Sequence, residues 1–163
     1  RPVPVLLAGR DDADEVVHFN SDAKLLADAF WPGPLTLVLR ALGAVPPTVT
    51  AGAGTVGIRV PDHPVPRTLA RALGRPVTGS SANSSGASSH TTAAGVEDDL
   101  GDAVDMVLRG ECGPHSLASS VVDCSGERVE LLRAGALSFE MLRSVVPSLQ
   151  LSRTASAAVD SRP

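Results

Sequence analysis

Several residue types are scarce in this chain of 163 residues, and their scarcity narrows the classes of protein to which it can belong. Aromatic residues make up 2% of the chain, so a core must be built from Val, Leu, Ala and Ile. No apolar run approaches the roughly 20 residues that a membrane-spanning helix needs. Residues 1–9 have too short an apolar stretch and no cleavage site for a signal peptide. We therefore expect a cytoplasmic protein without a membrane partner.

Cysteine and histidine are also rare and badly spaced for metal binding. Cys112 and Cys124 are the only cysteines, and they match neither a zinc-site spacing nor a CxxC motif. Two cysteines do not make a disulfide framework, so we expect reduced thiols, as is usual in the cytosol. The four histidines show no HExxH motif or paired-ligand spacing, and no structural metal is predicted.

The charge of the chain is weakly negative, with a formal net charge of -4 at pH 7. This argues against a general binder of the phosphate backbone, which is usually basic, although it leaves room for a local basic site. Lys24 is the only lysine, so arginine supplies nearly all positive charge. Arginine is the better bidentate partner of carboxylate and phosphate. A coding bias toward GC-rich codons is the favoured explanation of the same composition.

Hydrophobic periodicity and turn residues predict an irregular alternation of strands and helices. The predicted strands are residues 4–8, 35–40, 55–60, 75–79, 104–108, 119–124 and 128–133. The predicted helices are residues 14–18, 21–30, 64–73, 93–100 and 139–146, with Ser21, Thr92 and Ser138 as caps. Strands 119–124 and 128–133 form a hairpin. The pattern indicates a mixed sheet covered by helices, within one domain over 1–147, followed by a flexible tail over 148–163.

The strand at 55–60 is the first candidate for a binding site. Thr55, Gly57 and Arg59 point to one side of it, and the alternating apolar residues point to the other. An arginine on an inward sheet face usually meets an anion, and Gly57 leaves room for a ligand to approach the backbone. A solvated Arg59 on an edge strand is an equally good explanation.

Two further segments carry polar side chains at the ends of predicted strands. The loop 79–89 is rich in Ser, Asn and Gly and lies between a strand and a helix, where open α/β sheets commonly bind ligands. It lacks a P-loop lysine and a GxSxG nucleophile motif, and a simple solvated loop is the alternative. Ser119 and Arg133 lie on neighbouring predicted strands that a tight turn joins. No order of Ser, His and Asp supports hydrolysis.

Five segments, in order, together resemble a known family. They are WPGPLT at 31–36, TVGIRVPDH at 55–63, SSANSSG at 80–86, SSVVD at 119–123 and LRAGA at 132–136. These are similar to the family patterns WPGPLT, TVGxRxPxH, SSANxSG, STVVD and LRPGA of the YrdC-like threonylcarbamoyl-AMP synthases. Each motif alone is weak, but five in order, between about residues 2 and 146, make a specific match.

The resemblance implies a fold, a reaction and partners. The fold is α+β, a twisted mixed sheet flanked by helices around a concave ligand cavity. The reaction makes threonylcarbamoyl-AMP and pyrophosphate from L-threonine, bicarbonate and ATP, and Mg²⁺ accompanies ATP. The enzyme is a nucleotidyltransferase whose product goes to a threonylcarbamoyl-transferase complex that modifies adenosine in tRNA.

The resemblance also assigns roles to residues, position by position. Arg59, Ser81 and Ser119 contact L-threonine, with Arg59 pairing with the carboxylate through two hydrogen bonds. Four residues hold ATP, namely Thr55, Asn83, Thr91 and Arg133. No protein ligand for a metal and no covalent nucleophile is implied, so catalysis consists of positioning and charge stabilisation.

The chain departs from the family pattern in two places. The family's TDTxYG segment and the Lys and Arg of its KxRP motif, which steer ATP and bicarbonate, fall before residue 1, so we expect this stretch alone to be weakly active or inactive. Ala134 stands where the family has proline. Two other functions stay open: a non-catalytic module that binds RNA or a nucleotide, and the carbamoyl-transferring YrdC-like domain of maturation factors.

Overall fold

The computed structural model describes residues 2–84, 86–110 and 117–153. The chain divides into two compact units. The first unit comprises residues 1–79 and 118–163, and the second comprises Ser80–Leu117. No helix in the described part of the chain is long and apolar enough to cross a membrane.

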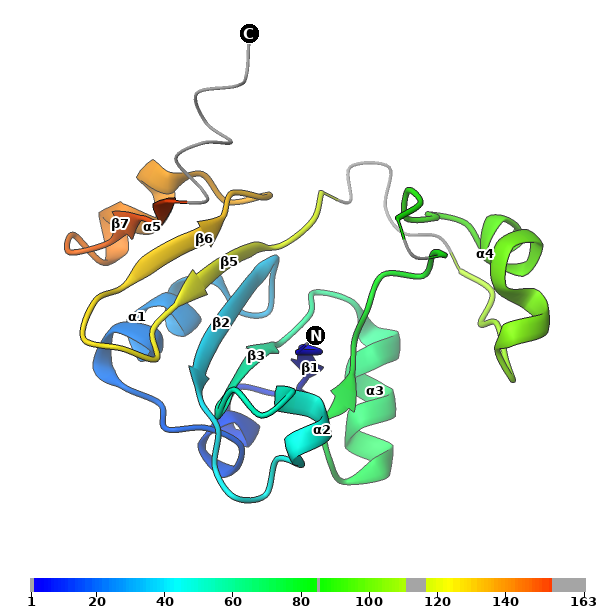
Figure 1. Cartoon of the computed structure of the whole chain (residues 1–163), viewed down its shortest axis with the longest axis horizontal. Coiled ribbons are helices and arrows are strands. Elements are labelled where there is room, and N and C mark those ends of the chain that lie inside the picture. Colours follow the sequence, from blue (N-terminus) through cyan, green and yellow to red (C-terminus); the bar gives the residue numbers. More distant parts are fainter. Residues whose placement is uncertain (1, 85, 111–116, 154–163) are drawn as a thin grey trace, which may run out of the picture. The chain divides into compact units, whose positions relative to one another are not determined.

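The first unit is built on a seven-stranded mixed sheet with the strand order β4-β1-β3-β2-β5-β6-β7 (Figure 1). The strands are β1 (Val5–Leu6), β2 (Leu35–Arg40), β3 (Thr55–Arg59), β4 (Val77–Thr78), β5 (Ser120–Asp123), β6 (Glu130–Arg133) and β7 (Gln150–Leu151). The pairs β1–β3, β2–β5 and β6–β7 are parallel, and the other three pairs are antiparallel. The predicted mixed sheet and its 119–133 hairpin are thus confirmed.

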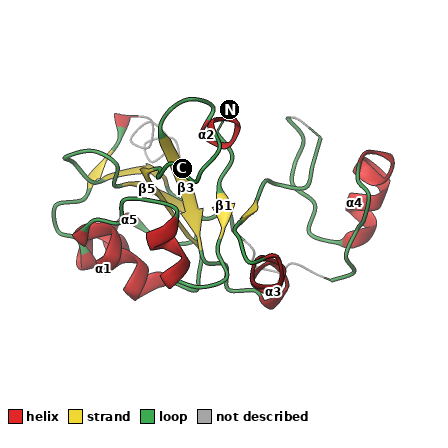
Figure 2. Ribbon diagram, turned by 90° about the horizontal axis from the view of Figure 1, so that it is seen from below, coloured by secondary structure: helices red, strands yellow, loops and turns green. Residues whose placement is uncertain are grey.

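One face of this sheet is apolar and forms the core. Alternating side chains of β2 and β3, such as Leu37 and Ile58, are fully buried on it. The helices α1 (Ser21–Phe30) and α5 (Phe139–Val145) lie together on one side of the sheet (Figure 2). Leu26 and Leu142 from these two helices are also fully buried. The aromatic side chains that pack against this core are only partly buried, namely Phe19, Phe30, Trp31 and Phe139.

Two further helices border the other strands. α3 (Pro64–Leu73) packs against β1 and β4, and it ends at Gly74, which has a left-handed φ of 62°. α2 (Pro47–Thr50) lies beside β3, in a stretch where the sequence predicts neither a helix nor a strand. A short 3-10 helix, η1 (Asp11–Glu15), replaces the predicted helix 14–18.

The second unit consists of a polar loop, α4 (Ala93–Leu100) and the 3-10 helix η2 (Gly101–Ala103). Thr92 caps α4 as predicted, with its Oγ1 accepting from the amide of Gly95 at 3.2 Å. The predicted strand 104–108 is wrong. Met106 and Leu108 are 75% and 52% exposed, and no strand pairs with this segment within the described residues.

Two other boundaries differ from the sequence prediction. The N-cap of α1 is Asn20 rather than Ser21, because the Asn20 side chain accepts from the amide of Ala23 at 3.0 Å. In the stretch assigned to a tail, Leu149 is buried and β7 pairs with β6, so this stretch belongs to the sheet. Residues 154–163 of the predicted tail lie outside the described residues.

Candidate functional site

The second face of the sheet carries polar side chains at one end of four neighbouring strands. Arg59 ends β3, and continuing the β2–β3 register places it opposite Thr36 near the start of β2. Ser119 precedes β5, which runs parallel to β2, and Arg133 ends β6, which runs antiparallel to β5. Strand alternation places Thr36, Arg59 and Ser119 on this face. Arg133 lies two residues after the buried Leu131 and reaches the same face because the β5–β6 register shifts between Val121 and Val122.

Arg133, Ser119 and Thr36 form a continuous chain of hydrogen bonds. Arg133 donates from Nε and Nη2 to the Ser119 carbonyl oxygen at 3.1 and 2.8 Å, and from Nη2 to Ser119 Oγ at 3.1 Å. The Thr36 and Ser119 hydroxyl oxygens lie 2.9 Å apart. Both hydroxyl-bearing residues are buried, at 7% and 8% exposure, so their hydroxyl groups are held away from bulk water, whereas Arg133 is exposed.

Arg59 is held by a tight turn that precedes β2. Its Nε donates to the Gly33 carbonyl at 2.8 Å, and the Gly33 amide donates to the Val60 carbonyl at 2.9 Å. Any side chain at Gly33 would strike the Phe30 carbonyl, so the turn requires glycine. The turn fixes one edge of the Arg59 guanidinium and leaves its two terminal nitrogens without a hydrogen-bond partner among the described residues.

The two guanidinium groups are close enough to repel each other. Burial lowers the pKa of Arg59, the neighbouring Arg133 lowers it further, and Asp62 opposes both effects. Neither arginine forms a salt bridge with a carboxylate of the described residues. A half-buried arginine beside a second, exposed arginine, with no salt bridge to either, is stabilised by an anion, which relieves the repulsion. This end of the polar face is therefore suited to a carboxylate or a phosphate.

Thr55 lies on the same face but at the far end of β3. Its register partner on β2 is Arg40, and the four residue steps from Thr55 to Arg59 correspond to roughly 13 Å along a strand. A ligand that touches both residues must extend along β3 above Gly57. A Cβ at position 57 would lie 3.2 Å from the Thr36 methyl group. Because Gly57 has no side chain, a ligand can approach the backbone of β3 at this point.

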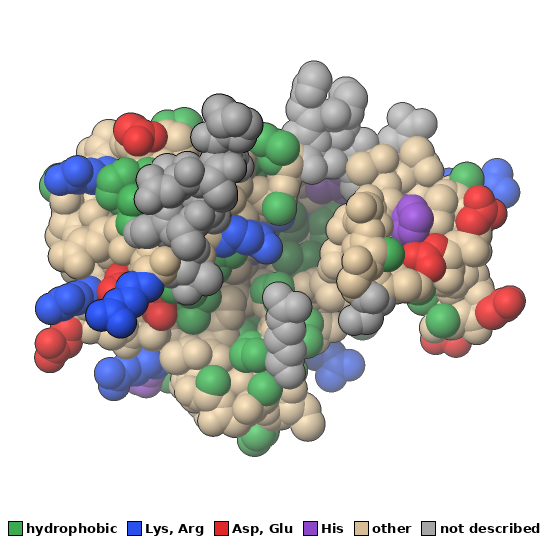
Figure 3. Space-filling view, turned by 45° about the horizontal axis from the view of Figure 1, so that its top comes forward, with side chains coloured by type: hydrophobic (Ala, Val, Ile, Leu, Met, Phe, Trp, Pro, Cys, Tyr) green, Lys and Arg blue, Asp and Glu red, His purple; other side chains and the backbone are tan. Residues whose placement is uncertain are grey.

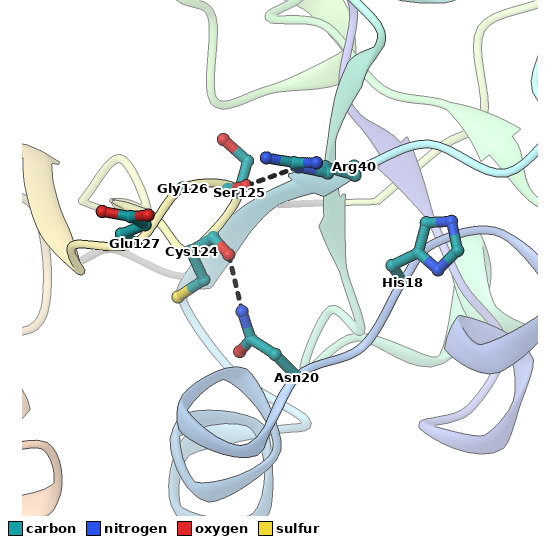
Figure 4. A pocket seen from close by; sticks show the side chains of 7 residues that line it. All are labelled: His18, Asn20, Arg40, Cys124, Ser125, Gly126 and Glu127. Carbon is teal, nitrogen blue, oxygen red and sulfur yellow. Dashed lines mark hydrogen bonds between the residues drawn. The ribbon is translucent and has the colours of Figure 1, made fainter.

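A separate pocket of about 420 Å³ lies at the opposite end of β2 (Figure 4). Its lining residues are His18, Asn20, Arg40, Cys124, Ser125, Gly126 and Glu127. Arg40 donates to the Ser125 carbonyl at 2.9 Å, and Asn20 donates to the Cys124 carbonyl at 2.7 Å (Figure 4). These polar groups brace the turn of the hairpin, and the pocket contains none of the predicted site residues.

The remaining predicted residues, Ser81, Asn83 and Thr91, belong to the second unit. Ser81 and Thr91 are exposed, and Thr91 precedes the cap of α4. The Asn83 amide donates to the carbonyl oxygens of Ser84 and Ala87 at 2.8 and 2.9 Å, so it holds the loop in shape. Their roles toward threonine and ATP stay predictions.

A carboxylate anchors the same loop to α4. Asp99 accepts from the Ser84 amide at 2.9 Å and from the Ser84 hydroxyl, and its Oδ2 lies 2.8 Å from His90 Nε2. The bonds from Ser84, followed by the bond from His90, lower the pKa of Asp99 to about 2. Ser84 binds the carboxylate rather than the imidazole, so the three side chains do not form a nucleophilic triad.

Neither metal ligation nor thiol chemistry is indicated by the described side chains. No group of three or more His, Cys, Asp or Glu residues lies together within residues 2–84, 86–110 and 117–153. Burial raises the pKa of Cys124 to about 12, with smaller contributions from Asp123 and Asp22, so its thiol stays protonated at neutral pH. Cys112 and His115 lie outside the described residues.

Two partners of the site were not predicted as site residues from the sequence. Thr36 contacts Ser119, and the Gly33 carbonyl holds Arg59. Both belong to the WPGPLT segment, whose match to a family pattern was the available signal. The contact itself joins residues 83 positions apart, which strand patterning cannot reveal.

Comparison with known proteins gives consistent matches over most of the chain. A family model described as "Telomere recombination" and covering Sua5, YciO and YrdC matches residues 1–135. A threonylcarbamoyl-AMP synthase from Bacillus subtilis is 38% identical over 132 residues, and one from Pyrococcus abyssi is 35% identical over 130. Each match covers 80% of this chain and 38% of the relative, so the chain spans less than half of their length.

A solved structure gives the same result for the fold. The crystal structure of P. abyssi Sua5 complexed with L-threonine superposes with a TM-score of 0.89 at 31% sequence identity. The match covers 99% of this chain and 47% of the Sua5 chain. The strand arrangement described above therefore occurs in a protein whose structure contains bound threonine.

Proposed function

Because this chain belongs to the Sua5/YciO/YrdC family, we propose that it contributes the threonine and nucleotide site of a threonylcarbamoyl-AMP synthase. The substrates are L-threonine, bicarbonate and ATP, which carries Mg²⁺ on its phosphates. The products are threonylcarbamoyl-AMP, pyrophosphate and water. The family resemblance inferred from the five sequence motifs is confirmed by the family match.

The observation that carries the proposal is the pair Arg59 and Arg133 on the polar sheet face. Both guanidiniums lack a salt bridge with a described carboxylate, and the neighbouring Arg133 adds to the burial that lowers the pKa of Arg59. Two anions enter the proposed reaction close together: the threonine carboxylate and the ATP phosphates. A carboxylate on Arg59 and a phosphate on Arg133 satisfy both cations. Threonine bound to P. abyssi Sua5 supports the first of these assignments.

The proposed chemistry needs no covalent intermediate with the protein. The threonine amine attacks the carbon of bicarbonate, a C–N bond forms and water leaves. A carbamate oxygen then attacks the α-phosphorus of ATP, and pyrophosphate departs. Arg59 and Ser119 hold threonine, and Arg133 balances the phosphate charge. Thr55, Ser81, Asn83 and Thr91 keep their predicted contacts, with Ser81 on threonine and the other three on ATP.

The proposal extends to the fate of the product. Threonylcarbamoyl-AMP is a mixed anhydride, so a second enzyme must transfer its acyl group to an amine. We infer that the acceptor is tRNA adenosine in the cytoplasm, through the threonylcarbamoyl-transferase complex that the family resemblance implies. Lys and Arg side chains are interspersed with Asp and Glu on the face drawn in Figure 3. This charge pattern does not favour the alternative of a general RNA-binding module.

The test is product formation under defined conditions. The protein is supplied with MgATP, bicarbonate and L-threonine, and threonylcarbamoyl-AMP is detected by mass spectrometry. Isotope-labelled bicarbonate should enter the product, and omission of threonine should abolish both the product and pyrophosphate release. Pyrophosphate release that is equal with and without threonine, or calorimetry that detects binding of neither threonine nor an ATP analogue, would contradict the proposal.

A further inference from the structure

We propose that Thr36 is a positioning residue that makes the Ser119 hydroxyl a hydrogen-bond donor toward the threonine carboxylate. The inference rests on the proposed function, since it concerns how the same site recognises its substrate. It starts from the 2.9 Å contact between the Thr36 and Ser119 hydroxyl oxygens. Thr36 itself does not have to touch threonine for this role.

The number of donors around Ser119 Oγ determines what its proton can do. Arg133 Nη2 donates to this oxygen at 3.1 Å, so one of its lone pairs is occupied. If Thr36 donates as well, both lone pairs are occupied and the Ser119 proton must point elsewhere. If Ser119 instead donates to Thr36, its only proton is used and it has nothing to offer an anion.

A carboxylate selects the first of these two arrangements. It accepts hydrogen bonds and cannot donate them, and a bond to a charged acceptor is stronger than a bond between neutral hydroxyls. Thr36 and Ser119 are both buried, so water does not compete freely for their protons. Threonine binding therefore fixes the direction of these hydrogen bonds. Thr36 donates to Ser119, Ser119 donates to the carboxylate, and Arg133 is the second donor to Ser119.

The hydroxyl and the methyl group of the Thr36 side chain make different contacts. Its hydroxyl faces Ser119, and its methyl lies over Gly57, where an added Cβ would come within 3.2 Å. Thr36→Val removes only the hydroxyl while keeping the branched shape. Thr36→Ser keeps the hydroxyl and removes the methyl. The two variants thus separate hydrogen bonding from packing.

The experiment measures the affinities of L-threonine and of a non-hydrolysable ATP analogue by calorimetry in wild type and both variants. Thr36→Val should weaken threonine binding about 10- to 100-fold, as expected for losing a bond that supports a charged acceptor. Thr36→Ser should stay within about threefold of wild type, since a hydroxyl remains to donate. ATP-analogue affinity should hold in both variants, because Arg133 keeps its two bonds to the Ser119 carbonyl.

A double-mutant cycle tests whether Thr36 acts through Ser119. Ser119→Ala removes the hydroxyl that meets the carboxylate, so adding Thr36→Val to it should cause little further loss of threonine affinity. Additive losses would overturn the inference, as would equal losses in Thr36→Ser and Thr36→Val. A parallel loss of ATP-analogue affinity would show a general disturbance of the sheet and would also overturn it. A wild-type protein that binds no threonine would instead contradict the proposed function itself.

Discussion

Gly135 lies so close to Ala118 that a side chain at position 135 would strike the Ala118 carbonyl oxygen. The same Cβ would also stand 2.6 Å from the backbone nitrogen of Ser120. The contacting atoms are backbone, which cannot move aside as a flexible side chain can. The turn after Arg133 is thus pressed against the backbone of Ser119, whose hydroxyl and carbonyl both bind Arg133.

We predict that Gly135→Ala damages the site as well as the fold. The strain should lower the free energy of unfolding by about 1–3 kcal/mol, the usual range for forcing extra volume into a packed position. It should also weaken ATP-analogue binding, because Ser119 and Arg133 shift together. The control is Gly126→Ala in the β5–β6 turn, where an added Cβ has no neighbour within 4 Å. Urea denaturation and calorimetry measure both effects, and equal behaviour of the two variants contradicts the prediction.

The Ser120 hydroxyl stabilises this same turn, and we expect its removal to lower the free energy of unfolding. Its hydroxyl donates to the Leu137 carbonyl at 2.7 Å and accepts from the amides of Gly135 and Leu137, both at 3.0 Å. Ser120→Ala leaves these groups unpaired next to a fully buried residue. The free energy of unfolding should fall by about 1–3 kcal/mol. Ser144→Ala, which removes one exposed bond to Met141, serves as the control and should change stability by less than about 0.5 kcal/mol.

Arg59 should be needed for threonine binding. In Arg59→Ala the carboxylate loses its cationic partner, and we expect a loss of about 2–5 kcal/mol in threonine binding. Arg40→Ala is a matched control, because Arg40 lies on the same sheet face but opposite Thr55, at the far end of the strands. Calorimetry with L-threonine compares the two variants. Unchanged threonine affinity in Arg59→Ala would remove this residue from the site.

Strand alternation predicted the polar face well, because period-two patterning is a local property of the chain. It gave β2 with its observed bounds and separated Arg59 from the buried Val56 and Ile58. It failed for 104–108, where the same alternation occurs without a neighbouring strand in the described residues. Alternation of apolar and polar residues requires no pairing partner. A sequence pattern therefore cannot distinguish an alternating segment that pairs in a sheet from one that does not.

Local sequence patterns did not predict which strands are neighbours in the sheet. The pair Ser119 and Arg133 was predictable because a short turn joins β5 and β6. Thr36 and Ser119 meet only because β2 and β5 are neighbours, although β3 and β4 lie between them in sequence. Strand β7 has two residues, which is too short for any periodic signal.

Arg133 and Asn83 should both affect nucleotide binding, but for different physical reasons. Arg133→Ala removes a cation, so affinity for an ATP analogue should fall by at least about tenfold and depend less on salt. Arg133→Lys should not restore this affinity, because lysine cannot reproduce the forked contact with Ser119.

Asn83→Ala removes the hydrogen bonds to the carbonyl oxygens of Ser84 and Ala87. A loss of ATP-analogue affinity in this variant should therefore be accompanied by faster amide hydrogen exchange in the loop. Wild-type affinity in both alanine variants would contradict their assignment to ATP.

The carboxylate that anchors the 83–90 loop should titrate well below an ordinary aspartate. The bonds from Ser84 and then His90 lower the pKa of Asp99 from 3.8 to about 2 in the folded chain. A lowered folded-state pKa means that ionised Asp99 stabilises the second unit above about pH 4. This contribution is lost as the pH falls from there through about 2.

We therefore expect the Asp99 carboxyl signal in NMR to titrate with a midpoint of about 2, together with the Ser84 amide that it binds. In Asp99→Asn the acid-dependent change at Ser84 should disappear, since the group that gains the proton is gone. Asp98→Asn is the matched control: it removes the same charge one position earlier on α4, and Asp98 has no hydrogen bond to the loop among the described residues. A midpoint near 3.8 in wild type would mean that the loop does not hold this carboxylate in solution. Because Asn83 lies in the loop that Asp99 anchors, acidification through this range should also weaken the contact with ATP that we assign to Asn83.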